Sequence, residues 1–388
     1  MRDYAVPVRP RAARRCLAAL VLVAAAAATT TAAVVTPSSA DAANGLWRSR
    51  AELAELATSG PAWERLKSTA DRSLGKPDIA NQGSRHDTNT LAAALVYART
   101  HQEAYRAKAR YGIAGAIGTE RGGRTLALGR NLPAYVIAAD LIDLRSYDPG
   151  LDGRFRRWLQ VVRTALLNGR TLIQTHERRP NNWGTHAGAA RIAAAAYLGD
   201  RADLDRAARV FKGWLGDRTI YSGFKFGELS WHCNPAKPVA VNPAGCTRRG
   251  ATLDGALPDD QRRVGRFSWP PKKENYTWEA LEGATVQAAL LHRQGYDAWQ
   301  WQDQALRRAV SWLYVQNRFA ATGDDTWVPW LVNSAYGTSF QVRPARTGKN
   351  MGFTDWTHAQ PSPAQPKAAQ QPEVGPNEGA TQVTERSR

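Results

Sequence analysis

The stretch Arg178-Arg179-Pro180-Asn181-Asn182-Trp183-Gly184-Thr185-His186 leads directly into an alanine-rich run that ends at Leu198. Alanine has the highest helix propensity and Gly199 is a common helix terminator, so the run predicts a helix. Its small side chains let neighbouring helices approach closely, which indicates a buried position. The unpaired N–H groups of a first helical turn attract anions. The polar residues at the start of this helix therefore form a candidate site.

Apolar residues recur at helical spacing along most of the chain, whereas the alternation typical of strands is scarce. The segments with helical spacing are Trp63 to Leu74, Leu91 to Thr100, Tyr105 to Ile117, Pro133 to Leu144, Phe155 to Leu167, Thr185 to Leu198, Leu204 to Leu215, Trp278 to Gln294 and Gln304 to Gln316. Successive helices joined by short turns favour an all-α fold. We expect an α/α toroid, or incomplete barrel of paired helices, in a single domain.

The two ends of the chain differ from its middle. Residues 1–42 combine arginines, an apolar run from Leu17 to Ala28 and a small-residue cleavage site, which predicts a signal peptide. That run is shorter than the roughly 20 residues of a spanning helix, so we expect a secreted protein without a stable membrane anchor after processing. Residues 43–358 form the predicted toroid domain. Residues 359–388 are rich in Pro and Gln and predict a disordered tail.

The chain carries a formal net charge of +18, most of it within residues 43–358. A basic exported protein fits an acidic polysaccharide as its partner. Nucleic acid is not predicted, because the arginines are spread among Asp and Glu and no nucleic-acid motif is present.

Two cysteines remain after the predicted signal peptide, Cys233 and Cys246. In an oxidising compartment, such an isolated pair predicts one disulfide. The chain has no Cys-x-x-Cys and no His-Glu-x-x-His motif, so neither a metal nor another cofactor is predicted.

Polar clusters precede several predicted helices. If alternate helices start at the same rim, these clusters line one cleft, although each alone is explained by helix capping. Trp183 and Trp231 lie in or near predicted loops, where indole rings can stack on sugars. The clusters are His86-Asp87-Thr88-Asn89, Arg130-Asn131, Asn181-Asn182 and Asn275-Tyr276.

With these motifs, the sequence resembles the alginate-lyase group of polysaccharide lyases. The resemblance spans Trp63 to Trp356 and implies an α/α toroid and β-elimination at a uronic acid, with an Asn, a His, an Arg and a Tyr in the site. In the family His directly follows the Asn pair, whereas here Trp183 does and His186 comes three residues later. The motifs are His86-Asp87-Thr88-Asn89, Arg130-Asn131-Leu132-Pro133, Asn181 to His186, Asn275-Tyr276-x-Trp278-x-Ala280-Leu281 and Gly352-Phe353-Thr354-Asp355-Trp356.

The chemistry of elimination needs these residue types. Removing the proton beside a uronate carboxylate builds negative charge, which an amide and an arginine stabilise. Tyr276 is able to take or give the proton, with His186 as companion base and His232 as its substitute. The catalytic candidates are Asn182, His186, Tyr276 and Arg266. The substrate-binding candidates are Asn181, Trp183, His86, Asn89, Arg130, Asn131, His232, Arg263 and Trp231.

Two other classes of function remain open. An inverting glycoside hydrolase on the same toroid needs two carboxylates roughly 6.5–9.5 Å apart. A secreted, non-catalytic glycan-binding protein needs none. The sequence does not decide the uronic acid, endo or exo action, which arginine neutralises the carboxylate, or whether His186 or Tyr276 is the base. The hydrolase candidates are Asp87, Asp140, Glu228, Glu279 and Glu282.

Overall fold

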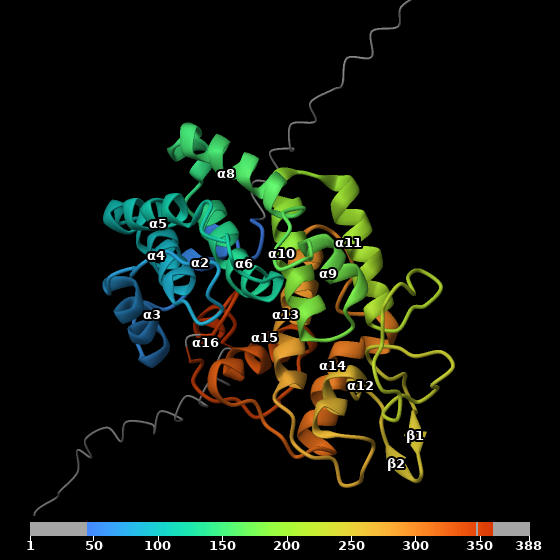
Figure 1. Ribbon diagram of the computed structural model, residues 1–388. Helices are drawn as coiled ribbons and strands as arrows, with labels where there is room; N and C mark the ends of the chain where they lie inside the picture. The colour runs from blue at the N-terminus through green and yellow to red at the C-terminus, as the bar shows by residue number, and fades with distance from the viewer. Residues whose placement is uncertain (1–44, 347, 360–388) are drawn as a thin grey trace, which may run out of the picture. The chain divides into compact units, whose positions relative to one another are not determined.

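The computed structural model describes residues 45–346 and 348–359, which lie in one compact unit, Ser38–Arg388. These residues are mostly helical (Figure 1). The predicted signal peptide and, apart from Ala359, the predicted tail lie outside them. The helices are α2 (Arg50–Ala54), α3 (Pro61–Asp71), α4 (His86–Thr100), α5 (Glu103–Ala116), α6 (Thr125–Leu141), α7 (Leu144–Tyr147), α8 (Pro149–Val162), α9 (Leu172–Arg178), α10 (Asn182–Leu198), α11 (Arg201–Trp214), α12 (Pro258–Gln261), η1 (Arg262–Val264), α13 (Tyr276–Arg293), α14 (Trp301–Val315), η2 (Gly323–Trp327), α15 (Val328–Tyr336) and α16 (Thr354–Thr357).

Within the described ranges, the strands form a single short antiparallel pair, β1 (Thr247–Arg248) and β2 (Ala251–Thr252). No described helix is both long enough and apolar enough to cross a lipid bilayer.

Every segment with helical spacing is confirmed as a helix, but each helix starts earlier than predicted, by the largest margins in α6, α8 and α4. The sequence places Pro133 at a helix start, where proline is favoured. In the structure α6 begins at Thr125 and Pro133 lies inside it. Likewise, α4 begins at His86 rather than Leu91. Two polar clusters predicted to precede helices are therefore part of them.

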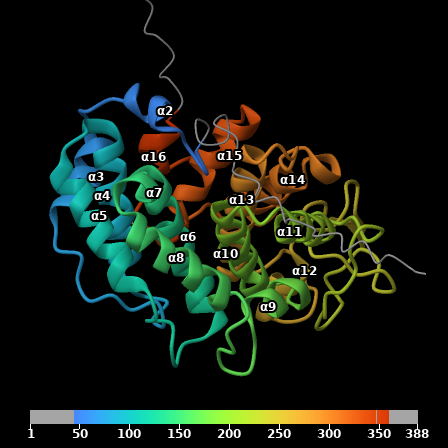
Figure 2. The ribbon, with the colours of Figure 1, turned by 90° about the horizontal axis from the view of Figure 1, so that it is seen from above.

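Four long helices, α4, α6, α10 and α13, form an inner layer in which each contacts the next. Figures 1 and 2 both show α6, α10 and α13 side by side. These helices bury almost every residue, whereas α3, α8 and α11 are amphipathic and bury one face. The contacts continue from α13 through the short helices α15 and α16 to α3 and back to α4. The all-α single domain is thus confirmed, with short helices and loops where a complete barrel would have further helix pairs.

Glycines allow α10 to pass unusually close to both of its neighbours. A Cβ atom at Gly129 of α6 would lie 2.8 Å from the carbonyl carbon of His186, and one at Gly283 of α13 would lie 2.4 Å from its nitrogen. Any larger residue would force the helices apart. Because Arg130 and Glu282 adjoin these glycines in sequence, the same close approach brings their side chains toward His186.

The long loop between α11 and α12 is closed by a disulfide. Cys233 and Cys246 are bonded, with their Cα atoms 5.8 Å apart, which confirms the predicted pairing. Trp231, which precedes the disulfide, is buried, and its Nε1 donates to the carbonyl of Gly265 at 2.9 Å. This indole is therefore part of the core rather than an exposed sugar platform.

Candidate active site

Asn182 is the first residue of α10 and is fully buried. Its backbone N–H donates to Asp260 Oδ1 at 3.1 Å, so the first-turn anion position predicted from the sequence is filled by a carboxyl group of the protein. Its side-chain Nδ2 donates to Glu279 Oε2 at 3.1 Å, and its Oδ1 accepts from Arg263 at 3.5 Å. Asn182 thus joins α10 to the α12–η1 segment and to α13.

Tyr276 lies next to this group. It starts α13 and is 38% exposed, and the guanidinium carbon of Arg263 lies 4.0 Å from the centre of its ring. Arg263 therefore bridges the phenol and the Asn182 amide. The other candidate arginine, Arg266, has an 85% exposed side chain and lies 3.9 Å from Glu228. Of the two arginines, Arg263 is the one beside Asn182.

Arg130 projects from α6 toward the same place and is surrounded by carboxylates. Its guanidinium lies 2.9 Å from Glu279 Oε2, 2.8 Å from Asp324 Oδ2 and 3.7 Å from Glu282 Oε2. Burial disfavours its charge, but the carboxylates outweigh burial and raise the pKa of Arg130 above its usual value. Arg130 is therefore a fixed cation that links α6 to α13.

His186 lies one turn below Asn182 and has no exposed surface. Its Nε2 is 3.5 Å from Glu282 Oε2, which is equally buried. Burial, reinforced by the charges of Arg130 and Lys349, holds the pKa of His186 well below its ordinary value. Burial also raises the pKa of Glu282 well above its usual range, despite the charge of Arg130. In this arrangement the imidazole is neutral and does not reach the surface.

Asn350 occupies a gap that Pro133 leaves in α6. Proline has no N–H, so the carbonyl of Gly129, four residues earlier, lacks its helical donor. The Asn350 amide is oriented so that its nitrogen faces backbone carbonyls and its oxygen faces the imidazole of His186. Its Nδ2 donates to the carbonyls of Gly129 at 3.2 Å and Arg130 at 3.0 Å. Its Oδ1 then accepts from His186 Nδ1 at 3.2 Å. One side chain near the end of the domain thus positions two predicted site residues.

Lys349 makes a similar connection beside it. Its Nζ donates to Asn131 Oδ1 at 2.7 Å and lies 3.1 Å from Asp87, and it also contacts the carbonyl of Ser84. Burial raises the pKa of the Asp87 carboxyl, and the Lys349 ammonium opposes that effect. Asn131 Nδ2 in turn donates to the carbonyl of Ile79 at 3.0 Å. Asn131 and Asp87 therefore fasten the C-terminal segment to α4 and α6.

The two remaining candidates on α4 have structural partners. His86 Nδ1 is 2.8 Å from the hydroxyl of Tyr135, and burial lowers the pKa of His86 to about 4. Asn89 donates to the carbonyls of Ser73 and Leu74 at 3.3 and 3.4 Å, which holds the loop between α3 and α4.

Three further candidates are partly or fully buried. Trp183 is half-buried, with the guanidinium carbons of Arg124 and Arg179 each 5.6 Å from its ring. Asn181 is buried, and its carbonyl accepts from the backbone of α10. His232 is fully buried, and burial lowers its pKa to about 4.

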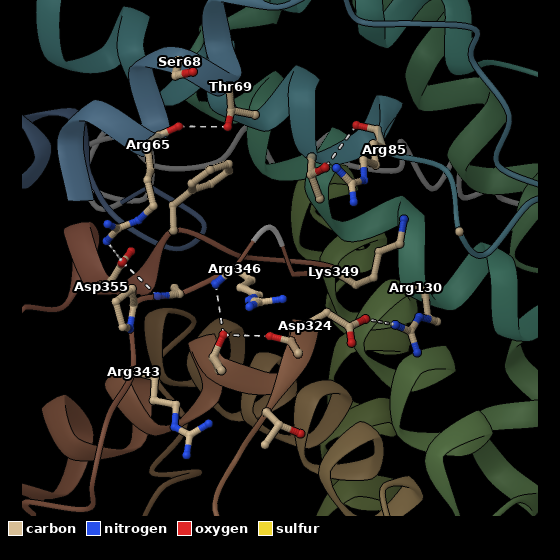
Figure 3. Close-up of a pocket in the computed structure, with 18 of the residues that line it drawn as sticks. Arg65, Ser68, Thr69, Arg85, Arg130, Asp324, Arg343, Arg346, Lys349 and Asp355 are labelled. Carbon is tan, nitrogen blue, oxygen red and sulfur yellow. Dashed lines mark hydrogen bonds and ion pairs between the residues drawn. The ribbon is translucent and has the colours of Figure 1, made fainter. Parts of the chain in front are cut away.

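A cavity of about 1370 Å³ opens beside Arg130 and Glu279, which both line it. Figure 3 shows its wall, with Arg85, Arg130, Arg346 and Lys349 around a common space. Three of the lining cations are ion-paired: Arg130 with Asp324, Lys349 with Asp87, and Arg65 with Asp355. The lining guanidinium groups without an ion pair among the described residues belong to Arg72, Arg85, Arg343 and Arg346. The cavity therefore offers an excess of positive charge.

The carboxylates considered for a hydrolase are mostly committed elsewhere. Of the candidates, Glu279 alone lines this cavity. Asp140 accepts from the backbone of Leu46 at 2.9 Å, and Glu228 accepts from Ser230 Oγ at 2.6 Å. Asp87 is paired with Lys349, and Glu282 is buried.

Sequence reasoning missed several residues of this site. Lys349 and Asn350 precede the motif that begins at Gly352, but neither residue type carries a signal by itself. The unpaired arginines could not be distinguished from other surface arginines, because only the fold shows which of them lack a carboxylate partner.

Comparison with known proteins gives one result. Residues 80–223, less than half of the chain, match the family model described as alginate lyase. This region is alginate-lyase-like and supports a polysaccharide lyase activity. It includes Arg130, Asn182 and His186, whereas Arg263 and Tyr276 lie beyond it. No curated protein and no solved structure matches the chain.

Proposed function

We propose that this alginate-lyase-like protein is a secreted polysaccharide lyase that cleaves a uronic-acid-containing polysaccharide by β-elimination. The observation that carries the proposal is the meeting of Asn182, Arg263 and Tyr276. Asn182 also contacts Glu279, which lines a cavity with unpaired arginines. An amide, a guanidinium and an accessible phenol are the groups that this reaction needs. The disulfide fits an oxidising compartment and hence export.

The carboxylate of the substrate is assigned to Arg263 and to Asn182. The Asn182 amide is buried beneath the side chain of Glu279, so it binds the substrate only when Glu279 moves aside. Loss of the proton from the carbon beside the carboxylate places negative charge on the carboxylate oxygens. Hydrogen-bond donors fixed in advance stabilise that charge in the transition state. Arg263 takes the role first given to Arg266, because it lies at the amide oxygen of Asn182.

Tyr276 is assigned the proton transfer. Its phenol is exposed, whereas the imidazoles of His186 and His232 are buried. A group that acts on substrate must reach it, at hydrogen-bond distance or through one water. Tyr276, as the phenolate, takes the proton from the carbon beside the carboxylate. A carbon–carbon double bond forms as the bond from the neighbouring ring carbon to the glycosidic oxygen breaks, and Tyr276 then returns the same proton to that oxygen. His186 is then a positioning residue, which contacts Glu282 and through it the guanidinium of Arg130.

The arginines of the cavity bind further acidic sugars of the same polymer. Guanidinium groups match carboxylates in geometry and keep their charge at every physiological pH. Arg85 and Arg346 belong to different parts of the chain but line the same cavity, so a polymer seated there contacts both.

The test is a panel of acidic polysaccharides that includes polyglucuronate, alginate and glycosaminoglycans. Elimination leaves a double bond conjugated with the carboxylate, so each cut is expected to yield one ultraviolet-absorbing end and one reducing end. Asn182→Ala is expected to abolish both signals together. Reducing ends without absorbance would move the protein to the hydrolases, and binding without either signal would make it a glycan-binding protein.

A further inference from the structure

Glu279 occupies the position of a bound carboxylate. Asn182 Nδ2 at 3.1 Å and the Arg130 guanidinium at 2.9 Å converge on the same oxygen, Oε2 of Glu279. Two donors directed at one carboxylate oxygen are what a uronate-binding site requires. Here they already hold a carboxylate that belongs to the protein.

This carboxylate is accessible to a ligand. The side chain of Glu279 is 22% exposed and lines the cavity, whereas Glu282, three residues further along α13, is fully buried. Glu279 also follows Tyr276 by three residues in α13, which puts both on the same face of the helix. A sugar ring held against the phenol therefore brings its own carboxylate close to Glu279.

Two carboxylates cannot share these donors without strong repulsion. Unit charges about 4 Å apart repel by several kcal/mol when they are partly shielded from water. Arg130 offers little relief, because Asp324 and Glu282 already lie beside it. An entering uronate must therefore displace Glu279 from Asn182.

We propose that Glu279 is a built-in competitor for the uronate carboxylate and that it sets the specificity of the site. A single uronic acid does not displace it. A longer polyanion does, because its neighbouring carboxylates also bind arginines such as Arg85 and Arg346. The site thus selects stretches of consecutive acidic sugars. This inference rests on the proposed function, since it takes Asn182 as the carboxylate-binding residue.

The experiment measures binding rather than turnover. Calorimetric titration of a glucuronate trisaccharide is carried out in the full chain carrying Tyr276→Phe, with and without Glu279→Gln. Removing the competing charge is expected to lower Kd about tenfold. The matched control is Glu64→Gln, which removes a carboxylate that lines the same cavity without contacting Asn182. It is expected to change Kd less than about twofold, because a distant, solvated charge is screened.

Glucuronic acid alone and a neutral glucose trisaccharide complete the comparison. The monosaccharide is expected to bind measurably only after Glu279→Gln, and the neutral sugar is expected to be indifferent to it. Glu279→Asp, which withdraws the carboxylate by one methylene, is a second variant in case the amide unfolds the protein. It is expected to lower Kd by a smaller factor than Glu279→Gln.

The inference and the proposed function fail in different ways. An unchanged or higher Kd in Glu279→Gln, with the variant folded, would overturn the inference even if wild-type protein yields the ultraviolet chromophore. Tighter binding without any chromophore from wild-type protein would leave the inference standing and reject elimination. If Glu279→Gln loses turnover and its pH–rate profile also loses one limb, Glu279 acts as a catalytic acid or base. That result would also overturn the inference.

Discussion

Tyr276 is the residue on which the proposed reaction depends most directly. Tyr276→Phe keeps the ring beneath Arg263 and removes only the hydroxyl, so the fold is expected to survive. General acid–base groups contribute typically about 10²–10⁴-fold, and turnover is expected to fall by that factor. The measurement is the rate of ultraviolet absorbance on the best substrate. Tyr111→Phe, on an exposed tyrosine of α5, is the control. Activity of Tyr276→Phe within a few-fold of wild type would exclude the phenol.

Asp140 gives a prediction about pH. Burial raises the pKa of its carboxyl to about 6, from an ordinary 3.8. The folded protein therefore binds more protons than the unfolded chain between about pH 4 and 6, and stability contributed by this group falls as the pH rises through that window. Asp140→Asn keeps an acceptor for the backbone N–H of Leu46 and removes the titration.

The Asp140→Asn protein is expected to be about 1–3 kcal/mol more stable than wild type at pH 7. Below about pH 4 the advantage should vanish, because the wild-type carboxyl is then protonated in both states. Chemical denaturation at several pH values checks this. Parallel stability curves for the two proteins would show that Asp140 does not titrate in this range.

The sequence could name candidates whose chemistry matches a local pattern, and Asn182 and Tyr276 are two of them. The structure places both of them in contact with Arg263, and their roles in the reaction stay predictions. The sequence could not choose between Arg263 and Arg266, since both precede Tyr276 by similar distances and only the fold of the intervening loop separates them. The burial of His186 is also a property of the assembled helices. A histidine one turn from Asn182 carries no sign of it in the sequence.

At the level of elements, the backbone donor that α6 lacks at Pro133 is coupled to the C-terminal segment. Asn350 donates to the carbonyl that Pro133 leaves without a partner. Asn350→Ala leaves that buried carbonyl unsatisfied and is expected to lower the free energy of unfolding by about 1–3 kcal/mol. In a Pro133→Ala background the helix supplies its own donor, so the same change should cost less.

A double-mutant cycle of Pro133→Ala and Asn350→Ala measures this coupling. An interaction of about 0.5–1.5 kcal/mol is expected, as for one hydrogen bond. Additive effects of the two substitutions would mean that Asn350 does not replace the missing helical donor. The sequence wrongly predicted a helix start at Pro133. A proline in the sequence shows that a backbone donor is missing, but it does not show that a distant side chain such as Asn350 replaces that donor.

The disulfide of the loop between α11 and α12 is a second prediction at this scale. Protein that begins at residue 43 is expected to show no reactive thiol when it is denatured without a reductant. Its loop encloses few residues, so replacing both cysteines by serine is expected to cost about 3 kcal/mol of stability. Two titratable thiols, or equal stability of the serine variant, would contradict this.

For the whole molecule, charge matters by its position more than by its sum. Arg85→Gln with Arg346→Gln removes two positive charges from the cavity, and Arg154→Gln with Arg157→Gln removes two from the exposed face of α8. Both pairs change the net charge of +18 equally. The cavity pair is expected to weaken polyuronate binding at least tenfold, and the α8 pair less than twofold.

Raising salt from about 0.05 to about 0.5 M should weaken the binding of wild-type protein to polyuronate, because screening removes long-range attraction. The difference in affinity between wild type and the variant with both cavity substitutions should therefore become smaller. Equal losses of affinity in both double variants, or binding that does not change with salt, would show that binding does not use this cavity.

The all-α class and its helices followed from periodicity alone. The closure of the ring by short helices did not, because they are too short for a periodic signal.

The contacts of Lys349 have a consequence for how the protein is made. Its partner Asp87 precedes it by 262 residues and is buried within α4. Until the ribosome has added Lys349, that carboxylate has no counter-charge, and the start of α4 cannot settle into its final place at low energetic cost. The arginine-lined wall is missing for just as long, since Arg343 and Arg346 arrive with the same segment. A nascent chain therefore cannot complete this cavity until almost the last described residues of the compact unit have been synthesised, so the cavity forms only at a late stage of biogenesis.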